Sequence, residues 1–328
     1  MSVDAERPYP DVFLLTGFLG SGKTSLIVDH LRDCETRNVG VIVNEVGQAD
    51  VDGAVIASER SGLPLAVLGN GCVCCTLTND LPYTIQALLA EREATGQQPL
   101  ERIIVETSGL SKPSPVMRSL LSIKAPVRTT IVSTYDSENG PATAPRFEEA
   151  VAQLAAAQTI VLTKTDRVEE EASQKAGAAA AFLNPLAHVV NEHDRARRAR
   201  AAFGRIERPL RSSFPSVPRQ QPRDLQHART KVFLVRFEAA PQWQALVEWI
   251  ENLAGFCGDR LLRTKGFVRI AETGQQVLLQ GVGATFDPPR EAPGGQARDD
   301  ALVVIARDIG HDDLMAIEPA LNIRISGL

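Results

Sequence analysis

The stretch VFLLTGFLGSGKTSLIVDH, residues 12–30, decides the fold. It begins with an apolar run typical of a buried strand, continues through a glycine-rich turn and ends in a helical pattern. The turn has the spacing G-x-x-x-x-G-K-T from Gly17 to Thr24. In this context the glycines let backbone N–H groups surround phosphate oxygens at the positive end of a helix. The stretch therefore predicts a phosphate-binding P-loop on an α/β fold.

The residues of this loop have separate expected roles. Lys23 brings a positive charge to the outer phosphates of a nucleotide and takes a catalytic role, and the Thr24 hydroxyl is a ligand for Mg²⁺. The alternative is a glycine-rich loop that binds nothing. The other positions expected to contact the nucleotide here are Gly17, Gly20, Ser21, Gly22 and Ser25.

Short Val-, Ile- and Leu-rich runs alternate with helical patterns over the first two thirds of the chain. Continuous apolar runs suit strands that are buried on both faces, and this alternation is typical of a parallel sheet covered by helices. The runs are residues 12–17, 39–44, 102–107, 128–135, 159–163 and 187–190. We therefore predict an α/β P-loop NTPase domain with a mostly parallel sheet over residues 1–211.

A second domain follows a stretch without hydrophobic periodicity. Residues 212–229 are rich in Pro, Ser, Gln and Arg, which indicates a linker. Beyond it, residues 230–328 contain strand patterns and one amphipathic helical pattern, so we expect a smaller α+β domain with a loop insertion at 286–300. The strand patterns cover 231–238, 266–272, 275–282 and 301–308, and the helical pattern covers 242–256.

Composition excludes some classes of function. The 328 residues include 35 Lys and Arg against 40 Asp and Glu, a net charge of −5, which offers no electrostatic reason to expect nucleic acid as a partner. The first ten residues lack the apolar segment of a secretion signal, and no apolar stretch approaches the roughly 20 residues that span a bilayer. We expect a soluble, cytoplasmic protein without a membrane partner.

A carboxylate follows the third of the predicted strands. Glu106 ends the run RIIVE and is followed by Ser108 and Gly109. A P-loop enzyme needs a second carboxylate here to order Mg²⁺ or its water, and Gly109 can present its N–H to the terminal phosphate. We expect Glu106 to be catalytic. The alternative is an acidic side chain that only caps a buried strand.

The sequence TKTD at the end of the 159–163 run predicts a guanine site. The carboxylate of Asp166 can accept both N–H donors of the guanine edge, and the stem of Lys164 can cover the ring. Thr163 stands where the G-protein signature usually has Asn, so we expect loss of an amide that ties this loop to the P-loop. Weaker affinity or relaxed guanine preference stays open, as does a simple solvated turn.

Three cysteines lie within four positions. The segment GNGCVCCTLTNDL, residues 69–81, contains Cys72, Cys74 and Cys75. Thiolates are soft ligands suited to Zn²⁺ and similar ions, and the positive end of a following helix favours the thiolate form. The spacing predicts a metal site in which Cys75 is structural or joins after a rearrangement. A redox switch and buried small hydrophobic residues are the alternatives.

The helix after the cysteines is predicted from an apolar stripe over residues 80–92, with Pro82 in its first turn. Upstream, Asn44, Glu45 and Asp52 follow the second predicted strand, where GTPases usually have their nucleotide-sensing segment. Glu45 and Asp52 can contact Mg²⁺ or complete the metal site, and a charged surface loop fits equally well.

The motifs GFLGSGKT, VIVNEVG, NGCVCCTL, IIVETSG and TKTD occur in this order, and RTKGFVRIAE and ALVVIARD follow in the second domain. With these motifs the chain resembles the CobW-like family of P-loop GTPases over nearly its whole length. Members of that family are GTP-hydrolysing chaperones or insertases for zinc, cobalt or iron, and some activate nitrile hydratase.

The resemblance implies Lys23, Thr24 and Glu106 at the nucleotide and Mg²⁺, and it places the three clustered cysteines at the transported metal. Gln48 stands where the family often has Glu, which weakens any metal site that would use this position. The linker has a single histidine, His227, instead of a His-rich stretch, so a metal-storage role is not expected.

We therefore expect a two-domain GTPase in which GTP and Mg²⁺ order the switch segment and the cysteine loop, and hydrolysis releases Zn²⁺ or Co²⁺, with Fe²⁺ as a further candidate. The second domain would recognise a client metalloprotein or a cofactor-assembly enzyme, with the chain as a monomer or homodimer. Two alternatives belong to other classes of protein. One is a P-loop kinase of a small molecule, and the other is a nucleotide-gated folding activator that carries no metal.

Overall fold

The computed structural model divides the chain into two compact units. The first comprises Met1–Ala180 with Ala187–Gly204, and the second Ala181–Leu186 with Arg205–Leu328. The structure describes residues 10–33, 38–44, 65–68, 76–123, 127–204, 229–292 and 299–327. All but the last residue of the predicted linker, 212–229, lies outside these ranges, so the domain boundaries stay predictions.

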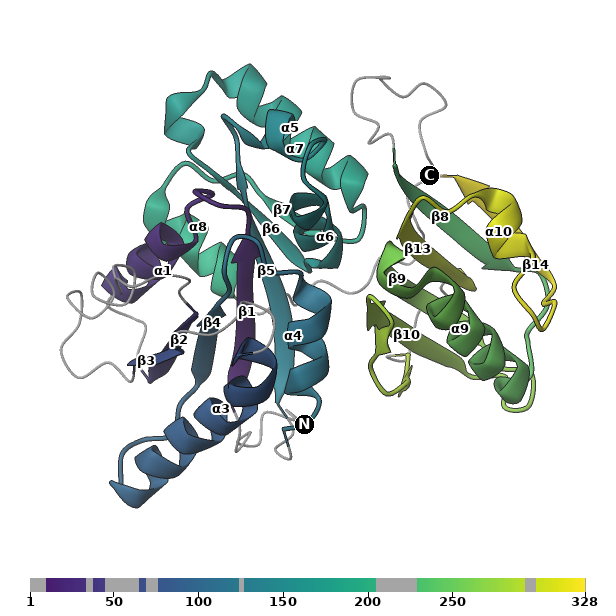
Figure 1. The fold of residues 1–328 in the computed structure, drawn as a ribbon, viewed down its shortest axis with the longest axis horizontal. Coiled ribbons are helices and arrows are strands. Elements are labelled where there is room, and N and C mark those ends of the chain that lie inside the picture. Colours follow the sequence, from purple (N-terminus) through teal and green to yellow (C-terminus); the bar gives the residue numbers. More distant parts are fainter. Residues whose placement is uncertain are drawn as a thin grey trace, which may run out of the picture. The chain divides into compact units, whose positions relative to one another are not determined.

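Within the described part of the first unit, seven strands form a central parallel sheet in the order β3-β2-β4-β1-β5-β6-β7 (Figure 1). The strands are β1 Asp11–Gly17, β2 Val39–Asn44, β3 Leu65–Leu68, β4 Arg102–Glu106, β5 Arg128–Asp136, β6 Thr159–Thr163 and β7 His188–Val190. All six sequence-predicted strands are present, which confirms the predicted fold class. The four-residue β3 was not predicted because so short an apolar run carries no periodicity.

Helices cover both faces of this sheet. Because successive strand residues point to opposite faces, Phe13 and Leu15 of β1 lie on one face, where they pack with side chains of α1 and α8. The rings of Phe13 and Phe203 meet edge to face at 5.6 Å. Helix α6 contacts β1 and β5, and α4 lies between α3 and α6. The helices are α1 Lys23–Arg32, α3 Thr76–Ala94, α4 Pro113–Leu120, α5 Gly140–Thr143, α6 Glu148–Ala156, α7 Glu170–Leu183 and α8 Arg195–Phe203.

Helix α3 is longer than the sequence predicts. It begins at Thr76, so Pro82 lies in its interior, and the expected first-turn position of Pro82 is wrong. A proline in a helix interior removes one backbone hydrogen bond. The buried stripe of α3 offsets this loss, because Leu81 and Ile85 are fully buried against the rest of the unit.

The second unit is an antiparallel sheet with helix α9, Trp243–Cys257, on one face. Its strand order is β11-β10-β9-β13-β8-β14, and β12 pairs with β10. The strands are β8 Thr230–Phe237, β9 Leu261–Arg269, β10 Gln276–Val282, β11 Thr285–Phe286, β12 Arg290–Glu291, β13 Ala301–Arg307 and β14 Ile323–Gly327, with the short helix α10 at His311–Met315. This arrangement confirms the predicted α+β class.

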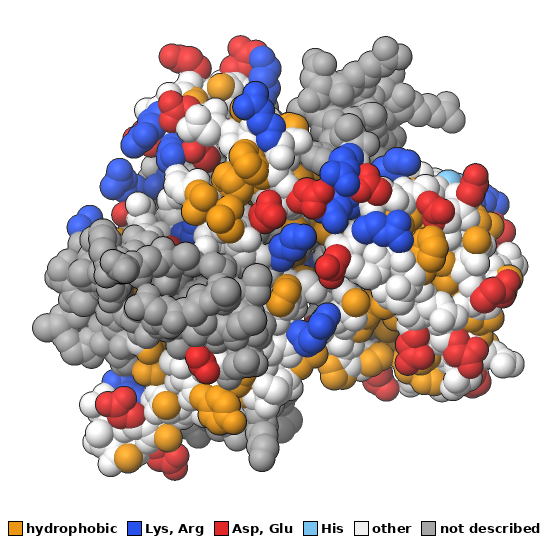
Figure 2. Space-filling model, viewed as in Figure 1, with side chains coloured by type: hydrophobic (Ala, Val, Ile, Leu, Met, Phe, Trp, Pro, Cys, Tyr) orange, Lys and Arg blue, Asp and Glu red, His pale blue; other side chains and the backbone are white. Residues whose placement is uncertain are grey.

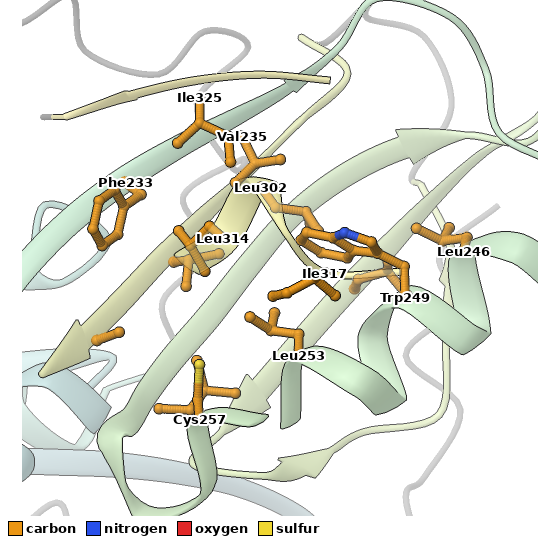
Figure 3. Close-up of a cluster of buried hydrophobic side chains, with 14 of the residues drawn as sticks. Phe233, Val235, Leu246, Trp249, Leu253, Cys257, Leu302, Leu314, Ile317 and Ile325 are labelled. Atoms are coloured by element: carbon orange, nitrogen blue, oxygen red, sulfur yellow. The ribbon is translucent and has the colours of Figure 1, made fainter. Parts of the chain in front are cut away.

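The core of the second unit lies between α9 and the sheet (Figure 3). Leu246, Trp249 and Leu253 extend from α9 toward Leu302 of β13, and all four are fully buried. Cys257 ends the same helix with its thiol buried. Burial raises the pKa of this thiol to about 11, so it stays protonated at neutral pH and serves as a core side chain.

The surface of the described residues has charges of both signs. Figure 2 shows acidic and basic side chains interspersed over the visible face. No helix within the described ranges combines the length and the unbroken apolar character that a membrane crossing requires.

Replacing Leu253 tests the core of the second unit. Leu253→Ala leaves a cavity beneath α9 and should lower the free energy of unfolding of this unit by about 2–5 kcal/mol. Both tryptophans of the chain, Trp243 and Trp249, lie in α9, so urea unfolding followed by tryptophan fluorescence reports on this unit. The exposed neighbour Glu251 provides the control: Glu251→Ala should change stability by less than about 0.5 kcal/mol. An equal loss in both variants would contradict the assigned core.

Candidate functional site

The P-loop lies between the end of β1 and the start of α1, and its backbone requires glycine at particular positions. Gly17 has φ 143°, and a Cβ added there would lie 2.1 Å from Oγ1 of Thr134. Gly22 has φ 90°, in the left-handed region that disfavours other residues. The loop thus turns tightly against β5, which leaves its backbone N–H groups at the N-terminus of α1.

Lys23 and Ser21 belong to this loop and are both buried. The ammonium of Lys23 donates hydrogen bonds to the carbonyl oxygen of Gly17 at 3.0 Å and to that of Phe18 at 3.5 Å. The Ser21 hydroxyl meets the hydroxyl of Thr134 on β5 at 2.7 Å. The ammonium of Lys23 therefore lies across the loop, and β5 holds the loop in place through Ser21.

A hydroxyl and a carboxylate from different elements meet beside the P-loop. The Thr24 hydroxyl donates to Oε1 of Glu106 at 2.8 Å, and Glu106 is 3% exposed. The contact exists because β4 pairs in parallel with β1, with Glu106 opposite Leu15. Both oxygens are hard donors of the kind that Mg²⁺ prefers, so this pair fits a magnesium ion. The structure thus brings together Lys23, Thr24 and Glu106, as the motif spacing predicts.

The loop after β4 lies against the P-loop. A Cβ added to Gly109 would lie 2.6 Å from the backbone nitrogen of Leu19, so the close approach requires glycine. Thr107 donates its backbone N–H to the carbonyl oxygen of Leu15 at 2.9 Å, which fixes the start of this loop. Within the described part of the chain, the N–H of Gly109 donates to no acceptor.

Thr163 connects the loop after β6 to the P-loop, although it lacks the amide of the asparagine that usually stands at this position. Its hydroxyl donates to the carbonyl oxygen of Ser21 at 2.7 Å, and the carbonyl oxygen of Tyr135 lies 3.3 Å away. Because the end of β6 lies close to the loop, a short hydroxyl side chain reaches the same backbone. The loop is therefore tied to the P-loop without the asparagine amide, and the effect of Thr163 on affinity and guanine preference stays a prediction.

Lys164 follows in the left-handed conformation, with φ 55°. Its ammonium lies 2.7 Å from Oδ2 of Asp136, at the end of β5. The carboxyl of Asp136 also accepts hydrogen bonds from the backbone N–H groups of Glu138 and Asn139 and from the Asn139 amide. Burial alone would raise the pKa of Asp136, but these hydrogen bonds and the one from Lys164 outweigh it and hold that pKa below its usual value.

Sequence reasoning missed Asp136, although an acidic residue at the end of the 128–135 run was a usable signal.

Asp166 lies in the turn of 3-10 helix Thr165–Arg167 with its side chain exposed to solvent, and Ser25 is exposed in the first turn of α1. A cavity of about 200 Å³ adjoins the site, lined by Leu19, Gly20 and Lys164 among others.

Several predicted residues fall outside the described ranges. They are Glu45, Asp52, Cys72, Cys74 and Cys75, and their roles stay predictions. Among the described residues, no three His, Cys, Asp or Glu side chains gather as a metal-ligand group.

Comparison with known families identifies both units. Residues 11–191 match the family described as CobW/HypB/UreG, nucleotide-binding domain, and residues 230–317 match the Cobalamin synthesis protein cobW C-terminal domain. The chain belongs to the CobW/HypB/UreG family. The resemblance seen in the motifs is thereby confirmed.

Similar proteins cover nearly the whole of this CobW-family chain. The zinc chaperone CobW of Pseudomonas aeruginosa is 27% identical, with 91% of this chain and 88% of the relative aligned. The zinc chaperone YjiA of Escherichia coli is also 27% identical, over 89% of this chain and 92% of the relative. The crystal structure of Zn(II)-bound YjiA GTPase from E. coli has a TM-score of 0.68 at 21% identity, covering 95% of this chain and 99% of that one. At that identity the structural likeness establishes the shared fold.

The Thr163 hydroxyl gives a test of how this CobW-family site holds its P-loop. Thr163→Val keeps the shape of the side chain but removes the donor to Ser21, and should weaken GDP binding by about fivefold, since one such bond contributes about 1 kcal/mol. Thr163→Ser retains the hydroxyl and should bind as the parent does. Titration with a fluorescent GDP analogue measures both. Equal weakening in the two variants would mean that the methyl group matters and the hydroxyl does not.

The buried carboxylate of Asp136 makes a pH-dependent contribution to the stability of the first unit. Its lowered pKa favours the folded state at pH values above the unfolded pKa of about 4, and the contribution is lost as pH falls through the folded value. Asp136→Asn should therefore destabilise this unit by about 1–3 kcal/mol at pH 7, and the difference should shrink below about pH 4.

Thermal unfolding followed by circular dichroism at several pH values measures this difference. Glu171 makes an exposed ion pair with Lys175, so Glu171→Gln serves as the control and should have little effect at any pH. A pH-independent destabilisation by Asp136→Asn would contradict the role of the charge.

Proposed function

We propose that this protein is a GTP-hydrolysing metal chaperone or metalloenzyme activator whose nucleotide state controls a Cys-x-Cys-Cys metal site. The observation that carries the proposal is the contact of Thr24 with Glu106 at 2.8 Å beside Lys23, in a chain with both units of the CobW family. The names of the relatives, zinc chaperones and a zinc-regulated GTPase metalloprotein activator, support the metal part.

The phosphate chemistry follows from the residues around the P-loop. Lys23 exchanges its bonds to loop carbonyls for bonds to the outer phosphates, and so stabilises charge that develops there during hydrolysis. Thr24 and Glu106 would hold Mg²⁺, which when bound neutralises phosphate charge. Glu106, buried and fixed by Thr24, orients the attacking water, and the N–H of Gly109 contacts the terminal phosphate.

Guanine selection rests on the loop after β6. The exposed carboxylate of Asp166 accepts the two N–H donors of guanine, which adenine lacks. The ion pair with Asp136 holds the Lys164 stem in place to cover the ring, and Thr163 keeps this loop in register with the P-loop. A small-molecule kinase needs no such guanine reader.

The topology supports coupling between nucleotide and metal. In a parallel sheet, the carboxyl ends of neighbouring strands lie at one edge, and β3, β2, β4 and β1 are neighbours in that order. The chain leaves β3 at Leu68, at the edge that holds Glu106, and Cys72, Cys74 and Cys75 come in the sequence between this strand end and the start of α3 at Thr76. Their thiolates suit Zn²⁺ or Co²⁺ as cargo, with Glu45 as a further ligand.

Loss of the terminal phosphate on hydrolysis then shifts this segment to an arrangement that releases the metal to a client metalloprotein or a cofactor-assembly enzyme. The C-terminal unit binds that client. The interspersed surface charges in Figure 2 give nucleic acid no basic patch among the described residues of that face, and we place the protein in the cytoplasm as a monomer or homodimer.

Metal affinity in different nucleotide states tests this function. If GTP orders the cysteine segment, Zn²⁺ and Co²⁺ should bind about five- to 150-fold more tightly to the Mg-GTP form than to the apo or GDP form, and metal must tighten GTP by the same factor. Titration against a competing chelator measures the first effect, with a non-hydrolysable GTP analogue in place of GTP. Nucleotide titration with and without Zn²⁺ measures the second.

Three variants complete the test. Cys72→Ser and Cys74→Ser should abolish the nucleotide-dependent metal binding and leave GTP binding intact, whereas Lys23→Ala should abolish GTP hydrolysis in a folded protein. Equal metal affinity in all nucleotide states, or binding that survives both cysteine substitutions, would show that the cysteines are not a nucleotide-gated metal site. A preference for ATP would favour the kinase instead.

A further inference from the structure

Gln153 makes two hydrogen bonds to the loop that follows β4. It lies on α6 and is fully buried, and its amide nitrogen donates to the carbonyl oxygen of Gly109 at 2.9 Å and to that of Ser111 at 3.0 Å. The two ends of this contact are more than forty residues apart in the sequence. A helix on one face of the sheet is thereby connected to the loop beside the P-loop.

The chemistry of the two partners fixes the orientation of the amide. Both partners are carbonyl oxygens, which only accept, so the nitrogen of Gln153 must face them and uses both of its N–H donors. The oxygen of the same amide is buried without a partner in the described part of the chain. Burying an acceptor in this way is unfavourable, so packing alone would favour an apolar side chain such as Leu or Met.

The loop that Gln153 holds is clamped between α6 and the P-loop. On the P-loop side, Gly109 approaches the backbone of Leu19 too closely for any side chain. On the other side, the Gln153 amide donates hydrogen bonds to the carbonyl oxygens of Gly109 and Ser111. Thr107 fixes the start of the loop to β1. The main chain from 107 to 111 is therefore held at both ends and in the middle.

Helix α6 provides a rigid base for the clamp, by which we mean the two hydrogen bonds from Gln153 to Gly109 and Ser111. Ala150, Val151 and Leu154 are buried on it, and the helix contacts β1 and β5. A side chain on such a helix loses little further freedom when it bonds the loop. Gln153 also lines the cavity beside Leu19 and Ser21, so it lies directly behind the P-loop.

We propose that Gln153 is a positioning residue that sets the affinity of the site for a nucleoside triphosphate over a diphosphate. It holds Gly109 at the place where its N–H meets a terminal phosphate. A diphosphate has no group there, so its binding does not depend on the clamp. The inference rests on the proposed phosphate-binding function and assigns a new residue to it.

Two substitutions remove the donors in different ways. Gln153→Met keeps the length of the side chain without any N–H, and Gln153→Glu keeps the shape but presents oxygens to two carbonyl oxygens. Both should weaken binding of a non-hydrolysable GTP analogue with Mg²⁺ about tenfold or more and lower kcat similarly. Binding of GDP should stay within about twofold to threefold of the parent.

A matched control separates positioning from general destabilisation. Val151→Ala removes a buried side chain from the same helix and should lower Tm without changing the ratio of the two nucleotide affinities. A second readout needs no nucleotide: hydrogen exchange of the backbone amides in residues 107–111 should be faster in Gln153→Met than in Val151→Ala, because only the former frees the loop.

The outcomes distinguish this inference from the proposed function. Equal loss of GTP-analogue and GDP affinity in Gln153→Met, or unchanged exchange in residues 107–111, would overturn the role of Gln153. The binding assays are also run with the adenine nucleotides, so that triphosphate and diphosphate affinities can be compared whichever base the site prefers. Failure of the parent protein to hydrolyse GTP would instead contradict the proposed function while the exchange measurement still decides the clamp.

Discussion

Parallel pairing of β1 with β4 on one side and β5 on the other is the constraint on which the site depends. Because all three strands run the same way, their carboxyl ends meet at one edge, and each end delivers a different group there. Strand β1 leads into the P-loop, β4 ends in Glu106 and β5 ends in Asp136. The pairing register of the three strands is enough to bring these groups together.

The P-loop in this protein is fixed mainly through its own backbone. Thr163 binds the carbonyl oxygen of Ser21, the side chain of Ser21 binds Thr134, and Gly109 abuts Leu19. The segments at the ends of β4, β5 and β6 therefore contact the loop without using its N–H groups. Such preorganisation limits the rearrangement needed when charge develops on a bound phosphate.

The sequence predicted the parts of this structure that depend on local pattern. Lys23, Thr24 and Glu106 were assigned from motif spacing, and the geometry joins Thr24 to Glu106 as that spacing implies. Contacts between distant side chains could not be foreseen in the same way. Gln153 reads as one polar residue in an alanine-rich helix, and its two bonds appear only when α6 is packed on β1. The hydrogen bond from Thr163 to the P-loop depends on the distance between β6 and that loop, and no pattern of residues predicts this distance.

The strand order of the second unit has a consequence for biosynthesis. Its first strand, β8, is paired on one side with β13 and on the other with β14, which contains the last residues of the sheet. Synthesis proceeds from the N-terminus, and domains generally fold as units, so β8 must wait for β14 to leave the ribosome. The described strands of the first unit's sheet all come before residue 191, so this unit can fold during translation. A nascent chain therefore has a formed nucleotide site while its second sheet still has an open edge at β8.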